Sequence, residues 1–290
     1  MKNTRRNKMM SAAALLLVLA SRDKIDKIPA TREGWTALGV GVSKEFENFP
    51  ALFAVPEELC RVVNDPQKQA ACLKLTGGKT GVLGGINLSD DEFTFQTFKL
   101  HLGRYPIVHI ASHFSLNAGT EADSYLLLGG GKTGDERKLT LASVRENLDT
   151  KFVGTELLVL SACNTAMLAG EQSSGAEIEG FGALAQQQGA KTVLASLWSV
   201  ADDSTRDLMS GFYQILETDL KISKAEALRQ AQIKLLHGKY QPAQIAERHR
   251  SEAVRFGASA SNFPKFIKDE NAPFAHPFYW SPFVLIGNWR

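Results

Sequence analysis

The sequence has few cysteines and lacks the spacings in which cysteines usually act as a group. Its 290 residues include three, Cys60, Cys72 and Cys163, and none of them belongs to a C-x-x-C pair. An odd number without such spacing fits a reducing compartment better than a disulfide scaffold. The chain also lacks basic runs interleaved with aromatics, and its 33 Lys and Arg nearly balance 31 Asp and Glu. This balance argues against direct binding of nucleic acid.

Long apolar runs are missing as well. The apolar run of residues 12–20 follows four basic residues near the start of the chain. It is too short to cross a bilayer as a helix, and no other segment is a candidate, so we expect no membrane association. The run is either the apolar part of a signal peptide or a buried first strand. A signal peptide implies export, whereas a strand implies the cytoplasm, which the cysteine usage favours.

From residue 35 onward, short apolar runs alternate with amphipathic helical patterns. This alternation predicts an α/β three-layer sandwich with a mainly parallel central sheet, because parallel strands buried on both faces form such runs. We therefore predict an N-terminal segment of residues 1–34 and one folded domain of residues 35–290. The predicted strands are residues 36–42, 106–112, 125–128, 156–162, 191–197 and 278–287.

Capping residues and glycines mark the ends of helices and the loops. Ser89 with Glu92 forms a capping box that predicts a helix reaching residue 102, and Ser223 with Glu226 does so for residues 225–236. Gly189 ends a helix that begins near residue 179. The predicted loops, rich in Gly, Ser or charge, are residues 76–85, 129–138 and 164–178.

Two glycine-rich pieces, GGKT at 77–80 and GGGKT at 129–133, suggest phosphate-binding loops. Such a loop needs a further glycine five residues before the Gly-Lys pair, and Leu73 and Leu126 stand there instead. The first strand is not followed by G-x-G-x-x-G either. Both pieces are therefore interpreted as surface turns, and a Rossmann-like nucleotide binder is a weak alternative.

Two histidines in the segment HIASH, His109 and His113, invite comparison with zinc peptidases. The residue after the first histidine is Ile110, where that chemistry needs a glutamate. In a strand the two rings would lie roughly 13 Å apart, too far to share a metal. We therefore expect no metal, and His109, inside an apolar run, is interpreted as a hydrogen-bonded core residue.

His113 and Cys163 each follow a predicted strand at its C-terminal end. In open α/β sheets this edge is where ligands bind. A nearby imidazole can take the thiol proton, which makes such a pair suitable for nucleophilic catalysis. Their separation of 50 residues (163 − 113) is also about the spacing known for caspases. The alternative is that Cys163 is a small buried residue of a core strand.

Four ordered segments resemble a known family. They are IVHIASHF, LLVLSACNTAMLAGE, EGFGALAQQQGAKTVLASLWSVADDSTRDLM and HPFYWSPFVLIGNW. Together with ALGVGVSKEFENFPAL near the start, they are similar to the CHAT family of caspase-like peptidases, relatives of separase and the caspases. The resemblance runs from about Ala37 to Arg290 and implies a caspase-haemoglobinase fold, so residues 35–290 are predicted to form a CHAT-like domain.

The resemblance also implies the roles of individual residues. His113 is the catalytic base, Cys163 the nucleophile, and the backbone amides of Phe114 and Cys163 form the oxyanion hole. The S1 pocket is implied near Ser161, Asp202 and Asp203, and an acidic pocket would prefer a basic P1 residue. Alternatively, the two aspartates only cap the helix that follows them. No cofactor is implied, and the partners are a protein or peptide substrate and a regulatory protein.

Two features depart from the family pattern. Phe114 stands where the family has glycine after the catalytic histidine. If that position needs a positive φ, phenylalanine resists it and the oxyanion hole is misshapen. Family members also usually carry further strands or a recognition region before the part seen here. These departures support a second hypothesis, a catalytically impaired CHAT-like module that acts as a protein-interaction domain.

Overall fold

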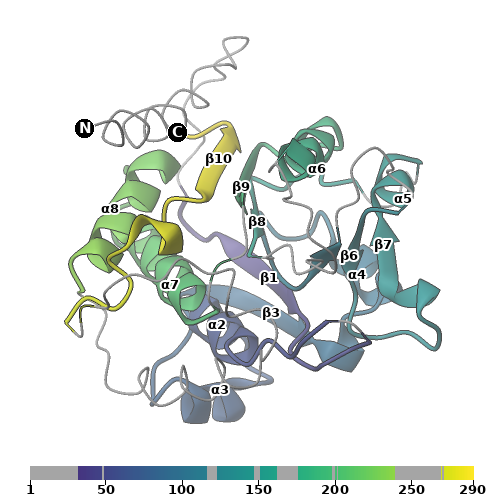
Figure 1. Cartoon of the computed structure of the whole chain (residues 1–290), viewed down its shortest axis with the longest axis horizontal. Helices are drawn as coiled ribbons and strands as arrows, with labels where there is room; N and C mark the ends of the chain where they lie inside the picture. Colours follow the sequence, from purple (N-terminus) through teal and green to yellow (C-terminus); the bar gives the residue numbers. More distant parts are fainter. Residues whose placement is uncertain are drawn as a thin grey trace, which may run out of the picture.

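A seven-stranded sheet forms the centre of the computed structural model, which describes residues 32–47, 49–115, 123–146, 151–161, 176–197, 200, 202–238, 269 and 271–290 (Figure 1). The strands are β1 (Thr36–Gly41), β2 (Val63–Asn64), β3 (Leu83–Ser89), β4 (Ile107–Ala111), β8 (Leu157–Leu160), β9 (Thr192–Ser196) and β10 (Phe283–Gly287). Their order is β10-β9-β8-β4-β1-β3-β2, and every neighbouring pair is parallel except β10 with β9.

Helices cover both faces of this sheet, which completes the three layers (Figure 1). On one side lie α2 (Val55–Val62), α7 (Asp202–Thr218) and α8 (Lys224–Leu236). On the other lie α4 (Phe95–His101), α5 (Leu141–Glu146) and α6 (Ala176–Gln187), while α3 (Gln69–Leu75) lies beyond α2. Short 3₁₀ turns span Asp90–Glu92, Asp135–Arg137 and Pro277–Tyr279. The predicted fold class, an α/β sandwich with a mainly parallel sheet, is confirmed.

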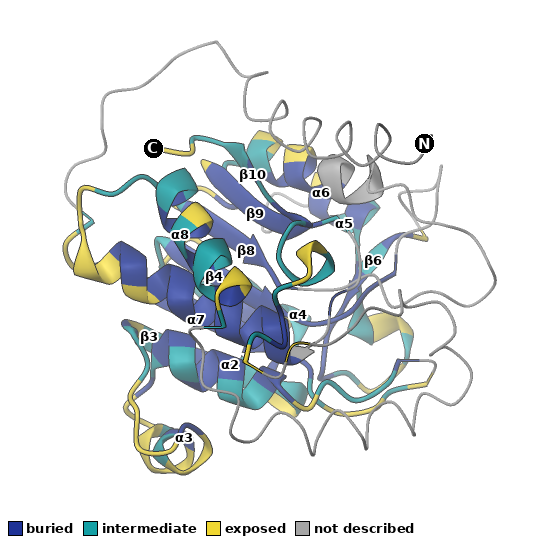
Figure 2. Cartoon of the chain, turned by 60° about the vertical axis from the view of Figure 1, so that its left-hand side comes forward, coloured by how far each residue is buried: buried dark blue, intermediate teal, exposed yellow. Residues whose placement is uncertain are grey.

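The two faces of the sheet enclose two cores. Val108 and Ile110 of β4 belong to the core under α4–α6, whereas Ile107 of the same strand belongs to the core under α7 and α8. Successive side chains of a strand point to opposite faces, so a strand between two helical layers must be apolar on both. Figure 2 shows the consequence, because the central strands are buried along their length while α3 is mostly exposed.

A second, three-stranded sheet corrects part of the strand prediction. β5 (Phe114–Ser115), β6 (Tyr125–Leu127) and β7 (Lys138–Thr140) pair antiparallel. The apolar run at 125–128 is therefore a strand, but it belongs to this small sheet. Only the second half of the predicted strand 278–287 is a strand. β3 was not predicted, because its first residues lie in the segment assigned to a loop.

The predicted helix ends are mostly right. The side chain of Ser223 accepts a hydrogen bond from the backbone of Glu226 and caps α8, and Gly189, with φ at +111°, follows the end of α6. The capping box of Ser89 and Glu92 is present, but it opens only a 3₁₀ turn. Thr94 then caps α4, so the single helix predicted from residue 89 is two elements.

A disulfide joins Cys60 of α2 to Cys72 of α3, with their Cα atoms 5.1 Å apart. The expectation that the cysteines are unpaired is therefore wrong. The two cysteines are 12 positions apart in the sequence, and the short segment between the helices, which contains β2, brings them together. The third cysteine, Cys163, lies outside the described residues.

In the part of the chain that the structure describes, no helix is both long enough and apolar enough to cross a membrane. The apolar run of residues 12–20, with its two interpretations as signal peptide or strand, lies outside the described residues. So do Cys163 and most of the predicted loop 164–178.

Candidate active site

His113 lies where β4 ends and the chain turns into the small sheet. β4 pairs with β1 on one side and with β8 on the other. Leu127 of β6 donates its backbone N–H to the carbonyl of His113 at 2.9 Å, and Ser112 Oγ donates to the carbonyl of Leu127 at 2.6 Å. The backbone around His113 is thus fixed by both sheets. This confirms the prediction that His113 follows a parallel strand at its C-terminal end.

The ring of His113 contacts Pro50 and Phe49. Nε2 lies 2.9 Å from the carbonyl oxygen of Pro50, and the ring of Phe49 lies 5.0 Å from the imidazole, centroid to centroid. A carbonyl oxygen only accepts hydrogen bonds, so Nε2 carries the proton. Nδ1 is then the nitrogen that accepts a proton, which is the role a general base needs.

The surroundings keep this imidazole uncharged. The side chain of His113 is fully buried. Burial lowers the pKa of His113 from 6.5 to about 4, although the hydrogen bond to the carbonyl of Pro50 acts in the opposite direction. A neutral imidazole at neutral pH is the form that can receive a proton from a thiol.

Phe114 occupies the position where the family has glycine, and it does so without backbone strain. The two non-glycine residues with positive φ in the described ranges are Glu47 and Asp90, so Phe114 has an ordinary extended conformation. Its ring packs in the core against Phe181, 4.9 Å away. The bond between Leu127 and His113 makes Phe114 and Leu126 a non-hydrogen-bonded pair, so the amide N–H of Phe114 points away from β6.

Ser161 follows β8 directly and is buried. Its backbone N–H donates to the carbonyl of Ile110 in β4 at 2.8 Å, so the pairing of β4 and β8 continues to this residue. Its hydroxyl donates to Oε1 of Glu58 at 2.5 Å. The same oxygen lies 2.9 Å from Nε2 of His109. His109 is therefore a paired core residue, as its position in an apolar run predicts.

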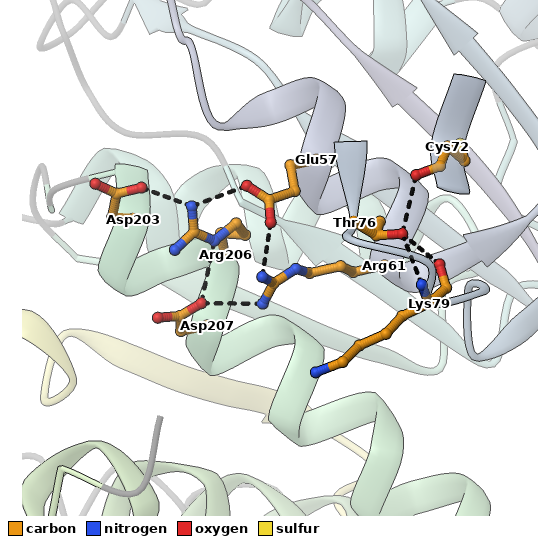
Figure 3. A network of polar contacts seen from close by, with 8 residues as sticks. All are labelled: Glu57, Arg61, Cys72, Thr76, Lys79, Asp203, Arg206 and Asp207. Carbon is orange, nitrogen blue, oxygen red and sulfur yellow. Dashed lines mark hydrogen bonds and ion pairs between the residues drawn. The ribbon is translucent and has the colours of Figure 1, made fainter. Parts of the chain in front are cut away.

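Asp202 and Asp203 begin α7, and Asp203 is part of a buried ion-pair network (Figure 3). Arg206 donates to Asp203 at 2.7 Å and to Glu57 of α2 at 3.1 Å. A second arginine, Arg61 of α2, binds Glu57 and Asp207 in turn. The network ties α2 to the start of α7, and the side chain of Asp202 lies outside the described residues.

Charge and burial oppose each other in this network. Burial acts to lower the pKa of Arg206, but Asp207, Asp203 and Glu57 outweigh it, so the pKa is raised and the guanidinium stays charged. Burial raises the pKa of Asp207, while Arg206 and Arg61 act to lower it. The carboxylate of Asp203 therefore already has a cationic partner within the protein.

Sequence reasoning missed the carbonyl of Pro50, Glu58 and Tyr213. A backbone carbonyl carries no mark in the sequence, and Glu58 sits in an ordinary amphipathic helix. The segment around Pro50 did form part of the family resemblance, and this was the one available signal. In the described part of the chain, no group of three or more His, Cys, Asp or Glu residues is arranged to hold a metal ion.

Comparison with known proteins identifies a family and finds a distant likeness among solved structures. The CHAT domain family model matches residues 4–288. The chain is similar to the crystal structure of the Arg specific cysteine proteinase gingipain R (RGPB), with 10% sequence identity and a TM-score of 0.40. The alignment covers 90% of this chain and 48% of that one, so the chain spans about half of its length. No curated protein matches the chain. Because the family match extends over nearly every residue, the chain belongs to the CHAT domain family.

Proposed function

We propose that this CHAT domain is a caspase-like cysteine endopeptidase in which Cys163 is the nucleophile and His113 the general base. The pairing of β4 with β8 carries the proposal. The strands are parallel neighbours, and their paired residues differ in number by 50, as Ile110 and Leu160 do (160 − 110). His113 and Cys163 differ by the same number (163 − 113). His113 and Cys163 therefore each stand three residues after a pair of neighbouring residues, Ile110 and Leu160, in adjacent strands.

The proposed reaction begins with transfer of the Cys163 proton to Nδ1 of His113. The thiolate attacks the carbonyl carbon of the scissile peptide, and the oxyanion is held by the backbone amides of Phe114 and Cys163. The C–N bond then breaks, and the leaving amine takes the proton from His113. Water hydrolyses the acyl-enzyme with His113 again as base. General-base help of this kind contributes roughly 10²–10⁴ in rate.

The family resemblance implies three substrate-binding residues, Ser161, Asp202 and Asp203. Since Arg206 binds the carboxylate of Asp203 at 2.7 Å, a basic substrate residue would have to displace it. We therefore assign recognition of a basic P1 side chain to Asp202, and to Asp203 the role of holding the start of α7. A protein or peptide is the substrate, and a regulatory protein partner controls cleavage, as the family resemblance implies.

Activity-based labelling tests the proposal. Peptidyl acyloxymethyl ketones with Arg, Lys, Ala or Asp at P1 should label the protein, fastest with Arg or Lys. Labelling should be lost in Cys163→Ala and slowed roughly 10²-fold or more in His113→Gln. His101→Gln, which changes a histidine away from β4, β8 and Pro50, should label like the wild type.

Two results would count against the proposal. Labelling that persists in Cys163→Ala would place the reactive group elsewhere. If all four probes leave the wild type unlabelled while it still captures a protein partner, the impaired interaction module is the better description.

A further inference from the structure

We propose that Glu58 is a positioning residue that holds together the two strands preceding His113 and Cys163. The inference rests on the proposed peptidase function and adds to it a third side chain, which does not touch substrate. Glu58 lies on α2 and is almost completely buried, with 3% of its surface exposed.

One carboxylate oxygen joins the two strands. Oε1 of Glu58 accepts a hydrogen bond from the hydroxyl of Ser161 at 2.5 Å and lies 2.9 Å from Nε2 of His109. Ser161 stands two residues before Cys163, and His109 stands four residues before His113. A displacement of Glu58 would therefore be transmitted both to β4 and to the residue that follows β8.

A tyrosine of α7 completes the chain of contacts. The hydroxyl of Tyr213 lies 3.2 Å from Nδ1 of His109, and both side chains are fully buried. Burial, reinforced by the nearby Glu58, raises the pKa of Tyr213 well above 10, so the hydroxyl keeps its proton. The two ring nitrogens of His109 thus contact Tyr213 and Glu58, and the chain of contacts ends at the Glu58 side chain.

Helix α2 also lies close to the end of β4 and to the segment around Pro50. Val55 and Leu59 of α2 pack against Ala111 at the end of β4, and α2 begins five residues after Pro50, whose carbonyl orients His113. Buried, fully bonded polar networks favour one arrangement over near alternatives, because each broken bond leaves a polar group unpaired in a low-dielectric interior. This is the physical basis for a positioning role.

Glu58→Gln and Glu58→Leu separate this role from simple stability. The glutamine keeps an acceptor oxygen for Ser161 and His109, so its kcat should stay near that of the wild type. The leucine keeps apolar volume but removes the acceptor, so kcat should fall roughly 10²-fold with KM unchanged. Ser161→Ala removes the hydrogen bond between Ser161 and Glu58 but keeps the contact between His109 and Glu58, and it should slow alkylation of Cys163 by iodoacetamide, which needs no peptide-binding pocket.

Asp65→Asn provides a matched control. Asp65 is also a buried carboxylate, and it accepts hydrogen bonds from the backbones of Asn87 and Gln67 at 2.9 Å each, but it lies between β2 and β3 at the far edge of the sheet. The Asp65→Asn variant should have a lower melting temperature than the wild type but the same kcat. The proposal would be overturned if Asp65→Asn lost as much kcat as Glu58→Leu. It would also be overturned if Glu58→Gln lost as much kcat as Glu58→Leu.

Hydrogen exchange separates this inference from the peptidase proposal. If the wild type fails to react with peptidyl probes, the peptidase proposal fails, and the positioning role is then judged from exchange alone. Glu58→Leu should speed amide exchange in residues 107–115 and 157–161, whereas Glu58→Gln and Asp65→Asn should not. Unchanged exchange in both segments of Glu58→Leu would refute the role of Glu58.

Discussion

Burial of a histidine couples its protonation to the stability of the fold, and His113 is such a residue. Its folded pKa of about 4 lies below its ordinary value of 6.5. Above pH 6.5 the side chain is neutral in the folded and unfolded chain alike. As the pH falls from 6.5 towards 4, the unfolded chain binds a proton that the folded chain does not, so this residue weakens the fold at acidic pH.

His113→Gln should therefore reduce the acid sensitivity of the protein. At pH 4.5 the wild type should lose about 2–3 kcal/mol of unfolding free energy through His113, relative to pH 7. The variant lacks this titration and should lose correspondingly less. Urea unfolding at both pH values measures the difference, and equal losses in the two proteins would show that His113 titrates normally in the fold.

At the scale of elements, the disulfide between α2 and α3 matters most, because α3 has little else to hold it. α3 is a seven-residue helix with one buried residue, Cys72 itself. Cys60 lies on the helix that carries Glu58 and Arg61, so the bond fixes α3 to the element that contacts both the candidate site and α7.

A thiol count checks this element directly. The denatured, unreduced protein should show one reactive thiol per chain, and reduction should raise the count to three. The double variant Cys60→Ser, Cys72→Ser should unfold with about 3 kcal/mol less free energy, as expected for closure of a loop of this length. Three thiols before reduction would mean that the pair is not oxidised in the isolated protein.

The sequence allowed some elements to be predicted because their physical origin is local. Buried parallel strands such as β4 and β9 are continuous apolar runs, and such runs predict strands directly. β3, LGGINLS, was not predicted because it contains two glycines and two polar residues. Gly85 has a structural reason, since a Cβ there would come within 1.9 Å of the carbonyl oxygen of Ala37 in β1. A close contact between two strands that are distant in the sequence produces no periodic pattern in that sequence.

Some features of the candidate site could likewise be predicted from the sequence, and others could not. The position of His113 after β4 could be predicted from the end of an apolar run. The contacts of His113 with Pro50, and of Ser161 with Glu58, join residues 63 and 103 positions apart. Such contacts depend on how β1, α2 and β8 pack, and the residue types alone do not indicate them.

At the scale of the whole molecule, the family match begins at residue 4, whereas the first strand of the sheet begins at Thr36. The division into residues 1–34 and 35–290 remains a prediction. A chain of residues 32–290 contains every described element, and it should unfold cooperatively at the same temperature as the full chain. Thermal melting followed by circular dichroism measures this, and a markedly lower midpoint would assign the preceding residues to the domain.

The position of β10 has a consequence for synthesis on the ribosome. β9 ends at Ser196, but its antiparallel neighbour begins only at Phe283. The interval of 87 residues (283 − 196) takes roughly 4–17 s to translate at about 5–20 residues per second. During that time one side of an apolar strand has its amide and carbonyl groups open to pairing with another nascent chain. Neighbouring ribosomes on one messenger would bring such chains close together, so we expect slower translation between α8 and β10 to increase pairing between incomplete chains.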